Sequence, residues 1–452
     1  MKIHLQKQPF RRGLSQGQFI ALGFLILILT GTMLLMLPVS SRDGQGIDFL
    51  SALFTATSAS CVTGLIVADT WTQWSLFGQL VILTMIQIGG LGFVTIGVFL
   101  AIQMRSHIGL KGRTLLQEST SAMQIGGILK LTGLIIRGTA LFEGIGALIL
   151  ALRFIPEYGF LRGCYYGIFH AVSAFCNAGF DLMGHMAPYN SLCGYVGDPV
   201  VNLVIVSLIL IGGIGFLVWE DILTNRHHFR RYRLQTKIVL IATAVLTFGG
   251  MLAFYLIEKD QTMAGMSAGQ AFWASLFCAV TPRTAGFNSV DTASLKDASK
   301  VLTMVFMLIG GSPGSTAGGV KTTSIVVILL YVSSCIQRTY GVNLFGRRLE
   351  EDAIKKASSI VAINMTLAVT AAIVIMAIQD LPMSDILFET FSAIGTAGMS
   401  TGVTRELLPF SRCLVIFLMY CGRIGSMSFA LSFTQQKQII KLQNPVEEIN
   451  IG

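Results

Sequence analysis

Charged residues are scarce in this chain. Only 12% of its 452 residues are Asp, Glu, Lys or Arg, whereas soluble globular proteins carry about 25%. Hydrophobic residues make up 53% of the sequence and stand in long uncharged runs. This composition excludes an ordinary soluble domain and predicts a protein that crosses a membrane several times.

Clusters of metal-binding or catalytic side chains are also missing. The eight cysteines are scattered without a CxxC pair, and no group of acids or histidines stands at one predicted membrane depth. Of the six histidines, only His170 falls within a predicted membrane loop. We therefore expect a protein that is not an enzyme and has no covalently bound cofactor. The sequence leaves open a disulfide between Cys164 and Cys193.

Basic residues are in excess, and the net charge is +9. They do not alternate with aromatic residues, so we expect no nucleic-acid partner. Of the 32 Lys and Arg, 21 fall in five segments, which are the N-terminus, Arg105 to Arg137, Arg226 to Lys237, Arg338 to Lys356 and the C-terminal tail. Cytoplasmic segments of membrane proteins accumulate such residues. The pattern predicts that both termini are cytoplasmic.

One sequence element occurs four times. Aligned on four glycines, the copies read FTATSASCVTG, FHAVSAFCNAG, LFCAVTPRTAG and FETFSAIGTAG, ending at Gly64, Gly179, Gly286 and Gly398. Each copy lies between long apolar segments, and its own apolar start is too short to cross a bilayer of about 30 Å. We predict an all-α membrane protein of four tandem repeats, each a helix, a re-entrant pore loop and a helix, around one central pore.

The repeats give eight spans. The predicted units are residues 1–110, 111–230, 231–345 and 346–452. The first span is the run from Gln18 to Leu37, which is too long for a signal peptide. The second is expected as one segment from Thr72 to Met104. The others begin near Ile128, Val200, Leu234, Val301, Ile354 and Leu407.

The four loops carry the candidate ion path. Non-helical backbone at membrane depth survives only inside protein or beside water, and backbone carbonyls can replace the hydration shell of an ion. None of the candidate lining residues is acidic, which favours a monovalent cation over Ca²⁺. These residues are Cys61, Val62, Thr63 and Gly64; Cys176, Asn177, Ala178 and Gly179; Arg283, Thr284, Ala285 and Gly286; and Gly395, Thr396, Ala397 and Gly398.

A second glycine-rich motif follows each loop, as IGGLG, IGGIG, IGGSPG and CGRIG. Small residues there let helices approach closely. In the third repeat the motif extends to Gly310–Gly319, GGSPGSTAGG, which cannot continue as a straight helix. It resembles a phosphate-binding loop only superficially, because Val320 stands where that motif needs lysine.

Three basic residues fall within membrane segments. An intramembrane arginine is costly and points to function, so Arg423 is expected at the path. Arg283 is expected to brace its loop, with Glu389 on the neighbouring loop as partner. Lys321 has no assigned partner.

The motifs VTGL, NAGF, TPRTAGFN and GTAGM, with IGGLGF and IGGIGF behind the first two, resemble the KtrB/TrkH superfamily of potassium transporters over nearly the whole chain. The eight-span length is most similar to the KtrB type. This resemblance implies transported K⁺, with Na⁺ as a possible activator, in a lipid-embedded homodimer of the bacterial plasma membrane. It also implies a cytosolic ring of nucleotide-binding regulatory subunits of the KtrA/KtrC type.

The resemblance further implies an intramembrane gate below the filter. Its candidate residues are Gly310, Gly311, Ser312, Gly314, Ser315, Thr316, Gly318, Gly319 and Arg423. Two alternatives stay open. One is a Trk/HKT-like transporter of Na⁺ or of both ions. The other is a secondary cation symporter, although the four copies share one orientation whereas such transporters often pair inverted halves.

Overall fold

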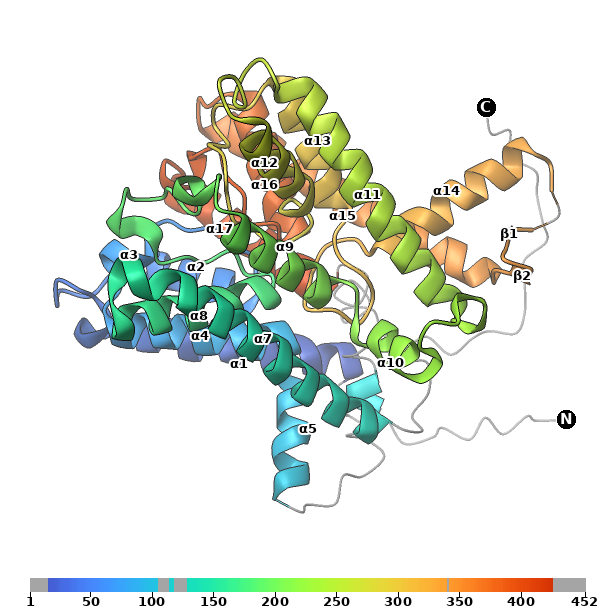
Figure 1. The fold of residues 1–452 in the computed structure, drawn as a ribbon, viewed down its shortest axis with the longest axis horizontal. Helices are drawn as coiled ribbons and strands as arrows, with labels where there is room; N and C mark the ends of the chain where they lie inside the picture. Colours follow the sequence, from blue (N-terminus) through green and yellow to red (C-terminus); the bar gives the residue numbers. More distant parts are fainter. Residues whose placement is uncertain (1–14, 105–113, 118–127, 340, 426–452) are drawn as a thin grey trace, which may run out of the picture.

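Four long apolar helices frame the protein (Figure 1). The computed structural model describes residues 15–104, 114–117, 128–339 and 341–425. Within them, one long helix opens each repeat, and each is long and apolar enough to cross a membrane. They are α1 (Gln16–Leu35), α7 (Ile128–Tyr158), α11 (Leu234–Glu258) and α15 (Glu351–Ile378).

The second helix of each repeat is interrupted or shorter. Repeat 1 has α4 (Leu76–Leu91) and α5 (Phe93–Gln103), bent by 88°, and repeat 2 has α9 (Pro199–Gly213) and α10 (Phe216–Asn225), bent by 92°. Repeat 3 has α13 (Asp297–Leu308) and α14 (Thr322–Ile336) on either side of a loop, and repeat 4 has α17 (Pro409–Ile424).

The prediction of one continuous segment from Thr72 to Met104 is therefore wrong. Gly92 and Gly215 have φ of +81° and +98° at the two bends, a conformation that ends a right-handed helix and that glycine adopts without a side-chain penalty. Gly425 has φ +92° directly after α17. The last glycine of the motif thus breaks the helix in repeats 1, 2 and 4.

A short helix stands between the two helices of each repeat, too short to span the membrane. These pore helices are α2 (Phe49–Ser60), α8 (Phe160–Phe175), α12 (Ala268–Val280) and α16 (Met383–Gly395). Asp48 caps α2 by accepting from the amide of Ser51, and Ser267 opens α12 with a capping box. Phe54, Phe169 and Phe388, which the repeats align, are completely buried.

The remaining elements are short connections. They are α3 (Thr70–Gln73), the 3₁₀ turns η1 (Pro38–Ser40), η2 (Met183–His185), η3 (Cys193–Tyr195), η4 (Phe229–Arg231) and η5 (Val403–Arg405), and the antiparallel strands β1 (Asn343–Leu344) and β2 (Arg347–Arg348).

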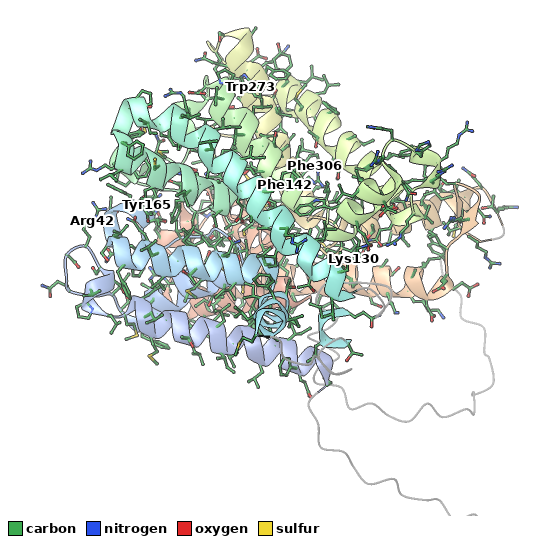
Figure 2. The ribbon with its side chains drawn as sticks, turned by 60° about the horizontal axis from the view of Figure 1, so that its bottom comes forward. Arg42, Lys130, Phe142, Tyr165, Trp273 and Phe306 are labelled. Carbon is green, nitrogen blue, oxygen red and sulfur yellow. The ribbon has the colours of Figure 1, made fainter. Side chains whose placement is uncertain are left out.

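The outward sides of the long helices are apolar. Leu148 and Leu152 of α7 and Val245 and Phe248 of α11 are all exposed, as expected of side chains that face lipid. Figure 2 shows Arg42 and Lys130 at opposite ends of the bundle. These residues come from a predicted outer loop and a predicted cytoplasmic segment.

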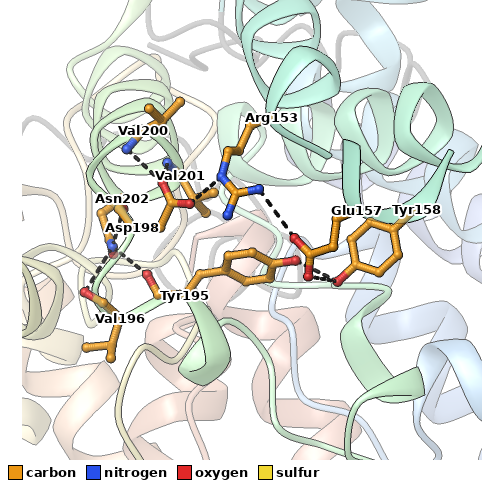
Figure 3. A network of polar contacts seen from close by, with 9 residues as sticks. All are labelled: Arg153, Glu157, Tyr158, Tyr195, Val196, Asp198, Val200, Val201 and Asn202. Atoms are coloured by element: carbon orange, nitrogen blue, oxygen red, sulfur yellow. Dashed lines mark hydrogen bonds and ion pairs between the residues drawn. The ribbon is translucent and has the colours of Figure 1, made fainter. Parts of the chain in front are cut away.

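A polar network joins α7 and α9 at one end of repeat 2 (Figure 3). Arg153 bonds both Glu157 and Asp198, while Asp198 caps α9 by accepting from the amides of Val200 and Val201. The hydroxyls of Tyr158 and Tyr195 lie 2.6 Å apart. This network fixes the start of α9 against the end of α7.

Glycine also lets α7 and α8 pack backbone to backbone. An ideal Cβ on Gly167 would lie 2.7 Å from the carbonyl oxygen of Ala147 and 2.7 Å from the nitrogen of Ala151. Backbone atoms cannot move aside as a flexible side chain can, so this contact requires glycine.

We predict that Gly167→Val lowers the stability of the protein by about 1–3 kcal/mol, the usual cost of overpacking. Gly133→Val is the matched control, because it makes the same substitution on α7 where, outside the backbone of that helix, no atom of the described residues lies within 4 Å of the new Cβ. The measurement is the thermal unfolding midpoint of purified protein in detergent. Equal shifts for the two variants would show that the close approach does not limit stability.

Candidate functional site

The four aligned glycines meet in one ring. An ideal Cβ on each would collide with the carbonyl oxygen of the residue before the next glycine in chain order, and the fourth closes on the first. These pairs are Gly64 with Ala178 at 2.6 Å, Gly179 with Ala285 at 2.7 Å, Gly286 with Ala397 at 3.0 Å, and Gly398 with Thr63. The ring therefore holds four carbonyl oxygens and has no space for side chains at the glycines.

The backbone around the ring is strained in the same way four times. The residue two before each glycine has positive φ: 55° at Val62, 58° at Asn177, 71° at Thr284 and 50° at Thr396. For β-branched Val and Thr this conformation is a genuine outlier, which costs about 1–3 kcal/mol at each position. Its recurrence in all four segments shows that the surrounding packing enforces it.

Hydroxyl groups behind three of the segments hold them in place. Ser58 Oγ accepts from the amide of Gly64 at 3.0 Å, and Ser173 Oγ donates to the carbonyl of Phe180 at 2.7 Å. In repeat 3 the aligned residue is Val280, and Thr281 instead donates to the carbonyl of Phe287. Sequence reasoning aligned these hydroxyls but gave them no role.

Each pore helix ends within three residues of the start of its segment of the ring, at Ser60, Phe175, Val280 and Gly395. A helix C-terminus carries partial negative charge. Four such ends together with four carbonyl oxygens favour a cation at the ring, without any carboxylate.

The second glycine motif packs against these helix ends. An ideal Cβ on Gly89, Gly212 or Gly422 would strike a carbonyl oxygen near the end of the pore helix of the same repeat, that of Ser60, Phe175 or Ile394. Close helix approach was the predicted role of the motif. Repeat 3 has its glycine-rich loop at this place instead.

Backbone hydrogen bonds join the two ends of the loop 310–319. The amide of Gly310 donates to the carbonyl of Val320 at 2.8 Å, and the amide of Thr322 donates to that of Gly311 at 3.0 Å. Between these closures, Ser312 and Thr316 donate their amides to the carbonyls of Gly213 and Gly212 at 2.9 and 3.3 Å. The loop is thus bound to the bend of repeat 2.

The loop also reaches the pore helices of repeats 2 and 4. Thr316 Oγ1 donates to the carbonyl of Phe175 at 3.1 Å. An ideal Cβ on Gly319 would lie 2.8 Å from the carbonyl oxygen of Gly395, and one on Gly318 would collide with Thr396. The predicted gate residues therefore lie together against the ends of α8 and α16.

Arg423 ties this loop to repeat 1. Its Nη1 donates to the carbonyl of Thr316, and its Nη2 donates to the carbonyls of Gly89 and Gly90, the latter at 3.0 Å. Lys321 binds the same loop, since its Nζ donates to the carbonyls of Ala317 at 2.7 Å and Gly318 at 3.4 Å. Two cationic side chains thus hold three successive carbonyls.

The predicted pair of Arg283 and Glu389 does not form. Glu389 accepts from Ser400 and Thr404, which follow Gly398, the ring glycine of its own repeat. Arg283 points instead into a small cavity beside Thr243 and Gly311. Its Nε and Nη1 have no hydrogen-bond partner in the described part of the chain. The two side chains leave adjacent segments in different directions, which sequence alignment does not report.

Sequence reasoning missed a carboxyl group inside the membrane. Glu143 lies midway along α7, and its Oε2 accepts from Gln87 Nε2 at 3.1 Å. Its Oε1 lies 3.8 Å from the thiol of Cys176, one of the candidate lining residues. The available signal was a lone acid within a long apolar run.

The cysteines are all free in the structure, including Cys164 and Cys193, so the disulfide that the sequence left open is not formed.

Four re-entrant segments held by paired helices define a multi-pass membrane protein of the pore-loop class. The family model described as "TrkH: Cation transport protein" matches residues 15–441. The chain therefore belongs to this family of cation transport proteins.

Two relatives that are named as uptake proteins agree with this family assignment. The chain is 41% identical over 423 residues to "Ktr system potassium uptake protein B" of Bacillus subtilis, covering 93% of each chain. It is 38% identical over 455 residues to "Potassium/sodium uptake protein NtpJ" of Enterococcus hirae, covering 99% of this chain and 100% of that protein.

The structure of the potassium transporter TrkH from Vibrio parahaemolyticus matches with a TM-score of 0.74 at 18% identity, over 95% of this chain and 87% of that one. The predicted all-α membrane fold of helix–pore loop–helix repeats is thereby confirmed.

We predict that Arg423→Ala loosens the loop. A hydrogen bond to a charged group contributes about 1.5–3 kcal/mol, so the amides of Ser312 and Thr316 should exchange with deuterium at least about tenfold faster. Arg412→Ala is the control, since Arg412 lies on the same helix but bonds the carbonyls of Leu407 and Arg405. Unchanged exchange at both amides would show that Arg423 does not secure the loop.

Proposed function

We propose that this protein is the potassium-translocating membrane subunit of a Ktr-type uptake system. The observation that carries this proposal is the ring of four carbonyl oxygens at Thr63, Ala178, Ala285 and Ala397, which is free of acidic side chains. The names of the relatives from B. subtilis and E. hirae support K⁺ as the transported ion.

Binding at the ring follows from its chemistry. A K⁺ ion entering the segments 61–64, 176–179, 283–286 and 395–398 exchanges its hydration water for carbonyl oxygens. The partial negative charge of the four pore-helix ends stabilises the ion further. Neutral oxygens suit a weakly hydrated monovalent ion better than Ca²⁺, which prefers carboxylates.

We assign the gate to the loop 310–319 together with Arg423. The contacts of Thr316 with Phe175 and of Arg423 with Thr316 support this assignment, because they hold the loop against the pore-helix ends. The positive charge of Arg423 also opposes passage of a cation. Opening requires these bonds to the loop to break.

We further propose a homodimer in the bacterial plasma membrane, with both termini in the cytoplasm and a nucleotide-binding regulatory ring on that side. The concentration of Lys and Arg in the five segments supports this orientation. The relatives named as Ktr system proteins support a multi-component system. Na⁺ is a candidate activator.

A second candidate is a transporter that carries Na⁺ as well as K⁺. One observation favours it, since the E. hirae relative is named a potassium/sodium uptake protein. Competition by Na⁺ in the uptake assay below separates the two candidates.

We predict that Gly286→Ser raises the K⁺ concentration for half-maximal uptake about tenfold, equivalent to about 1.4 kcal/mol of lost binding. The new Cβ would stand 3.0 Å from the carbonyl oxygen of Ala397 at φ +79°, so the ring must distort. The measurement is initial K⁺ uptake, with and without competing Na⁺, in cells that lack their own K⁺ uptake systems.

Gly249→Ser on α11 is the matched control for this experiment, since its new Cβ would meet no atom of the described structure within 4 Å beyond the backbone of its own helix. If serine at each of the four ring glycines left both K⁺ affinity and Na⁺ discrimination unchanged, the ring would not be the filter.

We predict that Arg423→Ala, or deletion of residues 314–318, raises the rate of uptake and weakens its dependence on the regulatory subunit. Removing a barrier of about 1.4 kcal/mol accelerates flux about tenfold. K⁺ affinity should change less than the rate, because the ring glycines are untouched. Maximal rates are measured with and without the regulator at matched expression.

Arg412→Ala again serves as control, because its contacts lie away from the loop. Wild-type rates and regulation in both the loop deletion and Arg423→Ala would place the gate elsewhere.

A further inference from the structure

A cationic side chain behind the third ring segment is buried without an acceptor. Arg283 has only 6% of its surface exposed, and its Nε and Nη1 have no hydrogen-bond partner among the described residues. A guanidinium group stays charged and carries donors only. Because a buried charge that has lost its partner is strongly destabilising, the structure calls for an acceptor at this place.

The guanidinium faces a small cavity where α9, α11 and the end of α12 meet (Figure 1). Thr243 of α11 lines the same cavity, and its Oγ1 likewise has no partner in the part of the chain that the structure describes. The cavity has room for about one water-sized molecule. Two elements that are distant in sequence thus bring unpartnered donor groups to one space.

No carboxylate of the described residues supplies the missing acceptor. The ion pairs found among them do not include Arg283, and Glu389 is bound within its own repeat. Arg423 and Lys321 add two further positive charges at the loop 310–319, part of which lines the cavity. The charge that surrounds the cavity is therefore positive.

The walls of the cavity favour an anion over water. A buried water molecule needs acceptors for its own protons. Apart from Arg283 and Thr243, the lining residues are apolar or glycine. The carbonyls of Gly213 and Gly311 in the wall already accept from main-chain amides of the loop and of α14. An anion has no proton to place, accepts from both donor groups and balances the charge.

We propose that this cavity is an anion site that holds one chloride ion between the guanidinium of Arg283 and the hydroxyl of Thr243. A monatomic ion suits a space of this size, whereas phosphate and other oxyanions need more room. The bound anion balances a positive charge directly behind the segment 283–286, where that charge otherwise opposes a cation at the ring. This consequence rests on the proposed K⁺ transport function, but the binding of chloride does not.

The test therefore measures anion binding rather than transport. The thermal unfolding midpoint of the purified full chain in detergent is followed while potassium chloride replaces potassium gluconate at constant K⁺ concentration. Gluconate is too large for the cavity. A ligand that binds only the folded protein raises the midpoint as its concentration passes its dissociation constant.

Two variants remove the two donor groups separately. Arg283→Gln removes the charge, and Thr243→Val removes the hydroxyl with little change of shape. Hydrogen bonds to a charged group are strong, so each variant should weaken the affinity for chloride at least about tenfold. Thr247→Val is the matched control. Thr247 lies one turn further along α11, and its Oγ1 also has no partner within the described structure, but it does not line the cavity.

A second measurement locates the ion. Bromide is close to chloride in size and scatters X-rays anomalously, so crystals grown in potassium bromide should show an anomalous peak between Arg283 and Thr243. The inference also requires a chloride-dependent midpoint in wild type that Thr247→Val keeps and Thr243→Val weakens.

The inference is overturned if the wild-type midpoint does not respond to chloride, if Thr243→Val responds as wild type does, or if the bromide peak is missing from the cavity. Should Arg283→Gln fail to fold, the comparison of the two threonine variants decides the outcome together with the bromide peak. None of these results depends on K⁺ uptake, whose failure would overturn the proposed function alone.

Discussion

An unpaired backbone carbonyl is costly inside a bilayer, and this protein gathers four of them at one place. Each of the four segments leaves its pore helix at mid-membrane, so its carbonyls lose their intrahelical partners. In the proposed filter the ring resolves this cost collectively, because a cation bound between the segments would be coordinated by the oxygens of all four. The glycines are required because the segments approach within van der Waals contact of one another.

The strain at Val62, Asn177, Thr284 and Thr396 follows from the same constraint. A segment that turns its backbone toward the axis must adopt dihedral angles that Val and Thr disfavour. The packing of the pore helices and the hydroxyl bonds of Ser58, Ser173 and Thr281 supply the opposing free energy. The packed pore helices and these hydroxyl bonds thus hold each segment in a backbone conformation that the isolated segment would not keep.

The sequence was sufficient to locate the repeats, because the ring position has no space for a side chain and glycine therefore stands there in all four copies. It also located the glycine-rich loop, whose composition excludes a straight helix. It did not reveal the bends at Gly92 and Gly215, because an apolar run with glycines reads alike whether the helix continues or breaks.

Sequence reasoning assigned the wrong partner to Arg283, because spacing along the chain does not determine the direction of a long side chain. The partners of Arg423 could not have been found either, because they are main-chain carbonyls, which every residue carries.

Those carbonyl partners would let Arg423, in the proposed gate, both anchor the loop and repel a cation. An Arg paired with a carboxylate would hold the loop more strongly, but the pair would be neutral and present little barrier to K⁺. Arg423 and Lys321 bind the carbonyls of Thr316, Ala317 and Gly318 instead, so their positive charges are only partly compensated. Movement of the loop would then remove the steric obstacle and displace part of the positive charge together. In the proposed gate, it therefore matters that neither Arg423 nor Lys321 forms an ion pair with an acid in the described part of the chain.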